Sequence, residues 1–170
     1  QQFSTPPMLA WLMAKAAAIS AHDTLLEPSA GNGAIALWGS VQNASLLLNE
    51  IDPARRDSLG HIYPSAAITA HDGELIADLH RGALPSVVLM NPPFARSQER
   101  GKDGETAMRH LRGAIRAAAG GARTVAIMPE GFDASTFARE QDEASLLLDV
   151  RLQQMFRRTG TGIAVRLVVF

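Results

Sequence analysis

The sequence contains no cysteine, which excludes disulfide bonds and thiolate-bound metal sites. Aromatic residues make up 5% of the chain, while 46% hydrophobic and 19% charged residues are usual for a globular domain. No apolar run is long enough to span a bilayer, and no basic segment precedes an apolar one at the start. We therefore expect no membrane segment and no signal peptide, and a cytoplasmic location. The five histidines show no shared metal-ligand spacing, so no metal site is predicted.

Charge is distributed unevenly along the chain, although the net charge is only −1. Residues 96–116 carry six basic and three acidic side chains, and residues 151–170 carry four basic and no acidic ones. Basic clusters of this kind steer polyanions, but an unevenly charged, solvated surface would have the same composition. Because the chain begins with Gln1 and ends in an apolar run, we expect a domain cut from a longer protein.

Apolar runs alternate with helix-like stretches from end to end, which predicts a parallel sheet covered by helices. Strands are expected at 24–27, 45–50, 66–70, 86–90, 124–128, 149–156 and 163–170. Helices are expected after a Thr5 cap, from about Gly33, from Pro53, and over 105–119 and 134–147. Residues 157–162 suit a hairpin turn, so the last strand should run antiparallel to its neighbour. No repeat or linker-like composition interrupts the chain, which predicts a single domain over 1–170.

A turn with two glycines, Glu27-Pro28-Ser29-Ala30-Gly31-Asn32-Gly33, follows the first strand. Ligands of doubly wound sheets bind at the carboxyl ends of the strands, and glycines let a ligand approach the backbone. Residues 31–36 also satisfy the relaxed dinucleotide fingerprint G-x-G-x-x-G/A, so NAD is a candidate ligand. A tight turn without a ligand would use the same residues.

Acidic residues follow the next two strands. Glu50 lies 17 residues beyond Gly33, where a carboxylate accepts hydrogen bonds from both ribose hydroxyls of a nucleoside. Asp52 is an alternative, although its place before Pro53 also suits a helix cap. Asp72 can accept from an adenine amino group, with Gly73 keeping the approach open, or it can cap a helix that starts near Glu74.

The most specific feature is Asn91-Pro92-Pro93-Phe94, directly after the strand over 86–90. Prolines fix the backbone and carry no N–H, so the segment presents carbonyls and the Asn91 amide. When Asn91 Oδ1 and the Pro92 carbonyl hold both hydrogens of an exocyclic amine, its lone pair points at a sulfonium methyl group. Phe94 offers a ring for a planar base, which would have to be flipped out of a duplex. A rigid turn with Phe94 in the core is the alternative.

Together and in this order, these motifs resemble the gamma-type N6-adenine DNA methyltransferases, which have a Rossmann-like class I core. Residues 2–6 look like the opening motif, whose threonine (here Thr5) contacts the methionine part of S-adenosylmethionine. Residues 27–33 are similar to the cofactor loop of the family, with Glu27, Ser29, Gly31 and Gly33 at the cofactor. Residues 49–52 are similar to its ribose-binding motif, with Glu50 and Ile51 at the cofactor, and residues 91–94 to its catalytic tetrad. Phe156 matches a second aromatic residue that packs on the flipped adenine. The motifs also look like methyltransferase domains fused to strawberry-notch-type helicases on bacterial mobile elements.

The resemblance implies an α/β fold with a mostly parallel seven-stranded sheet, an antiparallel last strand and helices on both faces. It implies S-adenosylmethionine as the cofactor, with Asp72 and Asn91 also beside it, and adenine in DNA as the methyl acceptor. Family members carry a separate target-recognition domain that this chain lacks. Either such a domain lies in another part of the protein, or specificity is low, or the substrate is different. Among partners we expect a specificity or helicase domain, on the same or another chain.

Other functions stay open at this point. Similar Asn-Pro-Pro-aromatic segments occur in methyltransferases of ribosomal RNA guanine and of release-factor glutamine, so RNA or a protein amide is an alternative acceptor. A non-catalytic binding module would have no need of Glu50, Asn91 and Phe94 together. An NAD-dependent oxidoreductase would leave residues 91–94 unexplained.

Residues 95–104 follow the proposed catalytic turn and show no apolar periodicity. We expect a loop that orders over the substrate, with Arg96, Arg100 and Lys102 near phosphates. Arg157 and Arg158, directly after Phe156, are candidates for the same role. A merely solvated loop is the alternative.

Overall fold

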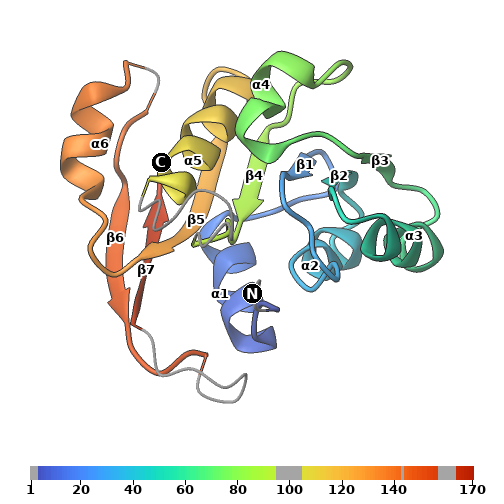
Figure 1. The fold of residues 1–170 in the computed structure, drawn as a ribbon, viewed down its shortest axis with the longest axis horizontal. Helices are drawn as coiled ribbons and strands as arrows, with labels where there is room; N and C mark the ends of the chain where they lie inside the picture. Colours follow the sequence, from blue (N-terminus) through green and yellow to red (C-terminus); the bar gives the residue numbers. More distant parts are fainter. Residues whose placement is uncertain (1–3, 95–104, 143, 157–163) are drawn as a thin grey trace.

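The computed structural model describes residues 4–94, 105–142, 144–156 and 164–170. Seven strands form one sheet in the order β3-β2-β1-β4-β5-β7-β6 (Figure 1). The five strands from β3 to β5 pair in parallel. Strand β7 lies between β5 and β6 and runs antiparallel to both. The predicted α/β fold, with a mostly parallel sheet and an antiparallel last strand, is confirmed.

The strands lie close to their predicted positions. They are β1 (Thr24–Glu27), β2 (Ser45–Asn49), β3 (Ala67–Thr69), β4 (Val87–Met90), β5 (Arg123–Pro129), β6 (Leu148–Leu152) and β7 (Val165–Val169). The largest difference is in β6, which was expected to reach residue 156 and ends at Leu152. The expected hairpin turn over 157–162 lies outside the described residues.

The helices are α1 (Pro7–Ala16), α2 (Ala36–Val41), α3 (Pro53–Ile62), α4 (Ile76–Leu79), α5 (Thr106–Ala117) and α6 (Ala134–Glu140), with a 3-10 helix η1 (Gly73–Leu75) before α4. None of the described helices is long and apolar enough to cross a membrane.

Three helix ends differ from the sequence prediction. Thr5 does not cap α1, because Pro6 takes the N-cap position without a side-chain hydrogen bond. Helix α2 begins at Ala36 rather than near Gly33, since Gly31 and Gly33 have φ of +57° and +77°, outside the right-handed helical region. Helix α6 ends at Glu140 rather than at 147, where the Leu147 N–H already donates to the Val169 carbonyl beside β7.

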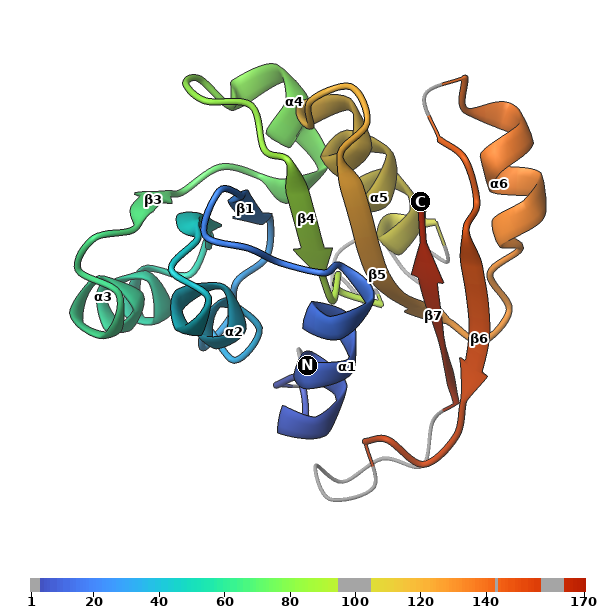
Figure 2. The ribbon, with the colours of Figure 1, turned by 180° about the vertical axis from the view of Figure 1, so that it is seen from behind.

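Two apolar layers cover the sheet because neighbouring residues of each strand point to opposite faces. In β4, Val87 and Leu89 pack with α1, whereas Val88 and Met90 pack with α5 and α6. A smaller cluster joins α2 and α3 to β2. Figures 1 and 2 show α1, α2 and α3 on one face of the sheet and α4, α5 and α6 on the other. The expectation of helices on both faces is therefore confirmed.

A polar network ties the amino ends of β1, β4 and β5 together. Asp23 Oδ1 accepts from the Ser86 hydroxyl at 2.7 Å and from the Arg123 guanidinium at 2.6 Å. The Ser86 hydroxyl in turn accepts from the Thr24 N–H at 3.1 Å. These contacts join segments that are 62 to 100 residues apart in the sequence, at the end of the sheet away from the predicted site.

Candidate active site

One pocket lies at the carboxyl ends of β1 and β4. Its lining comes from the residues before α1, the turn after β1, the start of α3 and the end of β4. It includes five predicted site residues, Thr5, Glu27, Ser29, Gly31 and Asn91. The structure thus brings together groups that are up to 86 residues apart in the sequence.

The two glycines of the turn after β1 have different surroundings. A Cβ atom added to Gly31 would meet nothing within 4 Å, and Gly31 lines the pocket. A Cβ atom added to Gly33 would lie 2.6 Å from Tyr63 Cε2 and 2.8 Å from Leu59 Cδ2. The Tyr63 hydroxyl also donates to the Gly33 carbonyl at 2.7 Å. Gly31 leaves room for a ligand, whereas Gly33 lets Tyr63 fix the turn.

Glu50 holds the same turn from the end of β2. Its Oε2 accepts from the Gly31 N–H at 2.7 Å, and its Oε1 accepts from the Asp52 N–H at 2.9 Å. Each carboxylate oxygen keeps a second lone pair for a further donor, such as a ribose hydroxyl. The neighbouring Ile51 is 66% exposed, so an apolar surface stands open beside this carboxylate. Asp52 caps α3 by accepting from the Arg55 N–H, which is the capping role considered for it.

Asp72 and Gly73 form the turn after β3. Asp72 caps η1 through the Glu74 N–H at 3.0 Å, and its contact with adenine stays a prediction. A Cβ atom at Gly73 would lie 2.7 Å from the His110 ring and 3.1 Å from the Pro28 carbonyl oxygen, so glycine allows α5 to pack closely there. That Gly73 also keeps the approach of a ligand open stays a prediction. Burial of His110 lowers the pKa of its imidazole.

Glu27 is the buried acidic group of the pocket, with 2% of its surface exposed. Burial raises the pKa of Glu27 well above its usual range, and the Glu50 charge raises it further against the effect of the Ala36 N–H. Its Oε2 is buried and has no hydrogen-bond partner among the described residues. A buried carboxyl group with an unused oxygen suits a cationic or hydrogen-donating ligand group.

Asn91 follows the fully buried Met90 and turns its amide towards the start of the chain. Its Nδ2 donates to Thr5 Oγ1 at 3.0 Å, and its Oδ1 accepts no hydrogen bond among the described residues. Pro92 is buried, whereas Phe94 is 36% exposed. The alternative that placed Phe94 in the core is therefore wrong, and its ring is accessible next to the pocket segment.

No protein-family profile and no curated protein sequence matches this chain. Solved structures do match. They include one described as the modification subunit of a type I restriction enzyme from Vibrio vulnificus (20% identity, TM-score 0.78, 99% of this chain and 44% of that one). TrmN from Thermus thermophilus matches at 18% identity with a TM-score of 0.71, over 96% of this chain and 48% of that one. SMU.1697c from Streptococcus mutans, described as a methyltransferase and solved with SAH, matches at 12% identity with a TM-score of 0.62, over 99% and 100%.

The chain has the Rossmann-like methyltransferase fold. It spans less than half the length of the modification subunit and of TrmN. In this methyltransferase fold the pocket of Glu27 and Asn91 lies at the carboxyl ends of the parallel strands, where ligands of open α/β sheets bind.

Phe156 does not line the pocket described above. Its ring is 4% exposed and packs in the same core cluster as Leu9 and Val165, because an apolar ring is more stable there than in water. The expected stacking of Phe156 on a base stays a prediction that this burial argues against. Arg96, Arg100, Lys102, Arg157 and Arg158 lie outside the described residues.

Sequence reasoning placed Asn49 in the ribose-binding motif but missed its own role as a buried residue with several hydrogen bonds. Its Nδ2 donates to the Pro28 and His71 carbonyls at 2.9 Å, and its Oδ1 accepts from the His71 N–H and the Thr69 hydroxyl at 2.8 Å. Asn49 thereby joins the turns after β1 and β3. The available signal was an amide residue at the end of an otherwise apolar strand, since such a group needs partners when buried.

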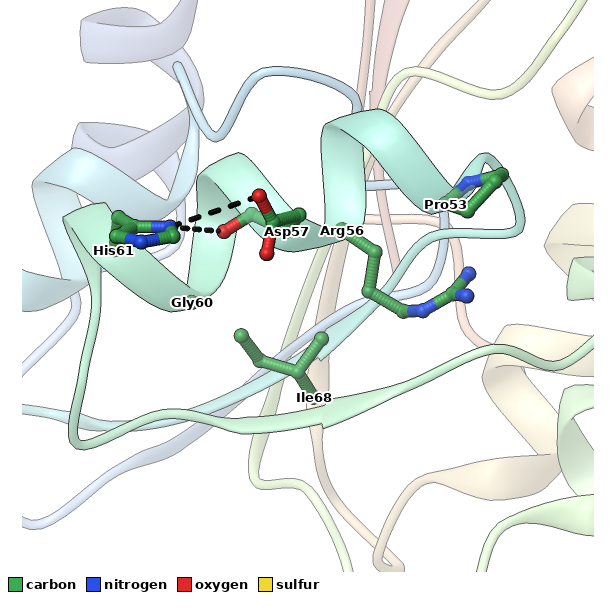
Figure 3. A pocket seen from close by; sticks show the side chains of 6 residues that line it. All are labelled: Pro53, Arg56, Asp57, Gly60, His61 and Ile68. Atoms are coloured by element: carbon green, nitrogen blue, oxygen red, sulfur yellow. Dashed lines mark hydrogen bonds and ion pairs between the residues drawn. The ribbon is translucent and has the colours of Figure 1, made fainter.

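Arg56 was also missed. Its Nη1 donates to the Glu50 carbonyl at 3.0 Å and to the Ile51 carbonyl at 3.1 Å, so it holds the end of β2. Arg56 also lines an open depression between α3 and β3, together with Pro53, Asp57, Gly60, His61 and Ile68. Figure 3 shows its guanidinium at the Pro53 end of that depression, with the paired Asp57 and His61 at the other end.

Proposed function

We propose that the chain is the catalytic core of an S-adenosylmethionine-dependent methyltransferase that acts on an amino nitrogen of a nucleic-acid base, with N6 of adenine in DNA as the acceptor. One observation carries the proposal: the Asn91 amide is held by Thr5, and its Oδ1 has no partner among the described residues, in the same pocket as the buried Glu27. Such an amide oxygen, three residues before the exposed ring of Phe94, suits a planar amine.

Residues that line the pocket, together with Glu50, Ile51 and Asp72 outside its lining, fit this cofactor. The unused oxygen of Glu27 suits the ammonium group, Glu50 has lone pairs for the ribose hydroxyls, and the open surface of Ile51 suits the adenine ring. Gly31 leaves the backbone of the turn accessible. Asp72 is proposed to accept from the adenine amino group, and Ser29 to line the methionine end. When bound, the cofactor supplies a sulfonium methyl group as the electrophile.

The residues of the chain would act mainly by orientation and by placed dipoles. Asn91 Oδ1 and the Pro92 carbonyl accept the two hydrogens of the exocyclic amine, which directs the nitrogen lone pair to the methyl carbon. In the transfer that the bound cofactor would supply, the new nitrogen–carbon bond would replace the carbon–sulfur bond, S-adenosylhomocysteine would leave, and the surplus proton of the amine would pass to solvent. Phe94 stacks on the base, a contact worth about 1–3 kcal/mol.

Nucleic acid as the substrate is supported by the fold likeness to a restriction-enzyme modification subunit. The chain spans 44% of that subunit, so target recognition is proposed to lie in a further domain of the same chain or of a partner chain. Arg96, Arg100 and Lys102 are proposed to contact phosphates, which would make binding sensitive to salt.

To test this, the protein is incubated with S-adenosylmethionine and unmethylated DNA, RNA or a release-factor peptide. The methylated product is then identified by mass spectrometry of nucleosides and peptides. We expect 6-methyladenine in DNA. Methyl groups found only on RNA or on the peptide would reassign the substrate. Calorimetry with S-adenosylmethionine and with NAD tests the cofactor, and tighter binding of NAD would overturn the proposal.

Asn91→Ala should lower methyl transfer by at least about 100-fold, since it removes a dipole that acts on the reacting nitrogen. Cofactor affinity, measured by calorimetry, should stay within a few-fold, because Glu27 and Glu50 are unchanged. An Asn91→Ala protein with full activity would contradict the mechanism.

A further inference from the structure

We propose that Thr5 is a positioning residue for methyl transfer: its hydroxyl fixes the orientation of the Asn91 amide so that Oδ1, and not Nδ2, faces the acceptor amine. The inference rests on the proposed function and adds to it the group that sets the orientation of the catalytic amide.

The contact between the two side chains is partly buried. Asn91 Nδ2 donates to Thr5 Oγ1 at 3.0 Å, and Thr5 is only 8% exposed. Both residues line the pocket that contains Glu27 and Gly31. Thr5 reaches this place from the first residues of the chain, while Asn91 is fixed by the buried end of β4.

The orientation of Asn91 matters because its side-chain amide has two ends of nearly equal size and opposite function. Rotation by a half turn would replace the acceptor Oδ1 with the donor Nδ2, which cannot hold the hydrogens of an amine. Among the described residues, the Thr5 hydroxyl is the only partner of this amide. A free hydroxyl could bond either end of the amide, so Thr5 selects the Nδ2 end when its own hydrogen is donated elsewhere, and its removal leaves no group among the described residues that makes this selection.

Thr5 can also make this orientation depend on the cofactor. A hydroxyl has one hydrogen and two lone pairs, and the Thr5 hydrogen has no acceptor among the described residues. The methionine part of the proposed cofactor carries a carboxylate next to the ammonium group that suits Glu27. Once the Thr5 hydrogen is donated to such an anion, only lone pairs remain for Asn91, so Nδ2 must face Thr5.

The test compares Thr5→Val, which keeps the shape and removes the hydroxyl, with Thr5→Ser, which keeps the hydroxyl. We expect Thr5→Val to lower kcat at saturating cofactor and DNA by about 10–100-fold, the usual range for a misplaced catalytic group. Thr5→Ser should stay within about three-fold of the original protein. Thr24→Val is the matched control, since Thr24 lies at the other end of β1.

Two further measurements separate positioning from cofactor binding. In an Asn91→Ala background, Thr5→Val should cause no additional loss of kcat, because there is no amide left to orient. In the original background, NMR of the Asn91 side-chain amide should show one hydrogen protected from exchange, and Thr5→Val should remove that protection.

The inference would be overturned if Thr5→Val weakened only the cofactor Kd while kcat was unchanged, or if the Asn91 amide signals were the same in both proteins. Failure of the proposed function looks different: the original protein would then transfer no methyl group to any amine. The NMR comparison needs no turnover, so it would still decide whether Thr5 orients Asn91.

Discussion

Glu27 is the residue whose ionisation is most strongly altered by the fold. It is buried, its Oε2 has no partner among the described residues, and Glu50 lies close enough to oppose its charge. The empty protein therefore holds a proton on this carboxyl group at a pH where an ordinary glutamate has lost it. A ligand with an ammonium group would favour the ionised form and displace that proton.

The raised pKa of Glu27 gives a pH-dependent stability. The unfolded chain loses this proton at the ordinary glutamate value, whereas the folded chain keeps it up to the raised value. Between the two values the free energy of unfolding should fall as the pH rises. Urea denaturation over a pH series should show this slope in the original protein and lose it in Glu27→Gln. Glu140→Gln, which removes an exposed charge, should retain the slope, and an unchanged slope in Glu27→Gln would refute the assignment.

Gly31 and Gly33 offer a matched pair for separating ligand access from packing. Alanine at either position must adopt a positive φ, which lowers the free energy of unfolding by roughly 1–2 kcal/mol. At Gly33 the new Cβ also meets Tyr63 and Leu59, which should cost a further 1–3 kcal/mol, roughly. Chemical denaturation should therefore rank Gly33→Ala as clearly less stable, while calorimetry should find the relatively greater loss of cofactor affinity in Gly31→Ala. Equal stabilities would contradict the packing role of Gly33.

Several individual site residues could be predicted from the sequence, because the carboxyl ends of parallel strands meet at one edge of the sheet. Glu27, Gly31 and Asn91 follow directly from that rule. The Thr5–Asn91 hydrogen bond and the burial of Phe156 could not be predicted. They depend on how side chains far apart in the sequence pack against one another, which no local pattern determines.

Two helical glycines show that the surroundings of a helix decide whether a glycine-to-alanine substitution raises or lowers stability. Gly60 in α3 is exposed, and an added Cβ would meet only Ile68 Cδ1 at 4.0 Å. Gly113 in α5 faces η1, where a Cβ would lie 2.8 Å from the Glu74 carbonyl oxygen. Gly60→Ala should stabilise the protein by about 0.5–1 kcal/mol through helix propensity. Gly113→Ala should destabilise it by roughly 1–3 kcal/mol because backbone atoms must move, and thermal unfolding of both variants would test the opposite signs.

The elements themselves were largely predictable, because fully apolar strands and proline-started helices have strong local signals. The ends of α2 and α6 were not. Helix α2 begins late because Gly31 and Gly33 adopt left-handed backbone conformations, in a turn that is held by Glu50 and Tyr63. Helix α6 cannot reach residue 147, because the Leu147 N–H pairs with the Val169 carbonyl. Both reasons involve contacts with the rest of the fold.

At the scale of the whole molecule, Asp23 joins the amino ends of β1, β4 and β5, which are distant in the sequence, through hydrogen bonds. Burial alone would raise its pKa, but hydrogen bonds from Ser86 and Ser20 and the charge of Arg123 lower it. The stabilisation is therefore present above the ordinary aspartate value and is lost as the pH falls through the lowered one.

Asp23→Asn should accordingly cost about 1–3 kcal/mol at neutral pH, since it removes an acceptor of several hydrogen bonds. The free energy of unfolding of this variant should also fall less steeply as the pH is lowered into the acid range, measured by urea denaturation over a pH series. Asp142→Asn removes an exposed charge and serves as the control. A variant with the same acid profile as the original protein would show that Asp23 is not the group responsible.

Helix α1 ties the first residues of the chain to its last strands, and this has a consequence for biosynthesis. Its buried face, including Leu9 and Met13, packs in one cluster with Val125 of β5 and Val165 of β7. A ribosome synthesises β5 and β7 after the turn at Gly31 and after Asn91, so the part of the α1 docking surface that these two strands supply is added late. A nascent chain that stops before β5 can place Val87 and Leu89 against α1, but the cluster around Leu9 and Met13 is complete only once β7 has left the ribosome.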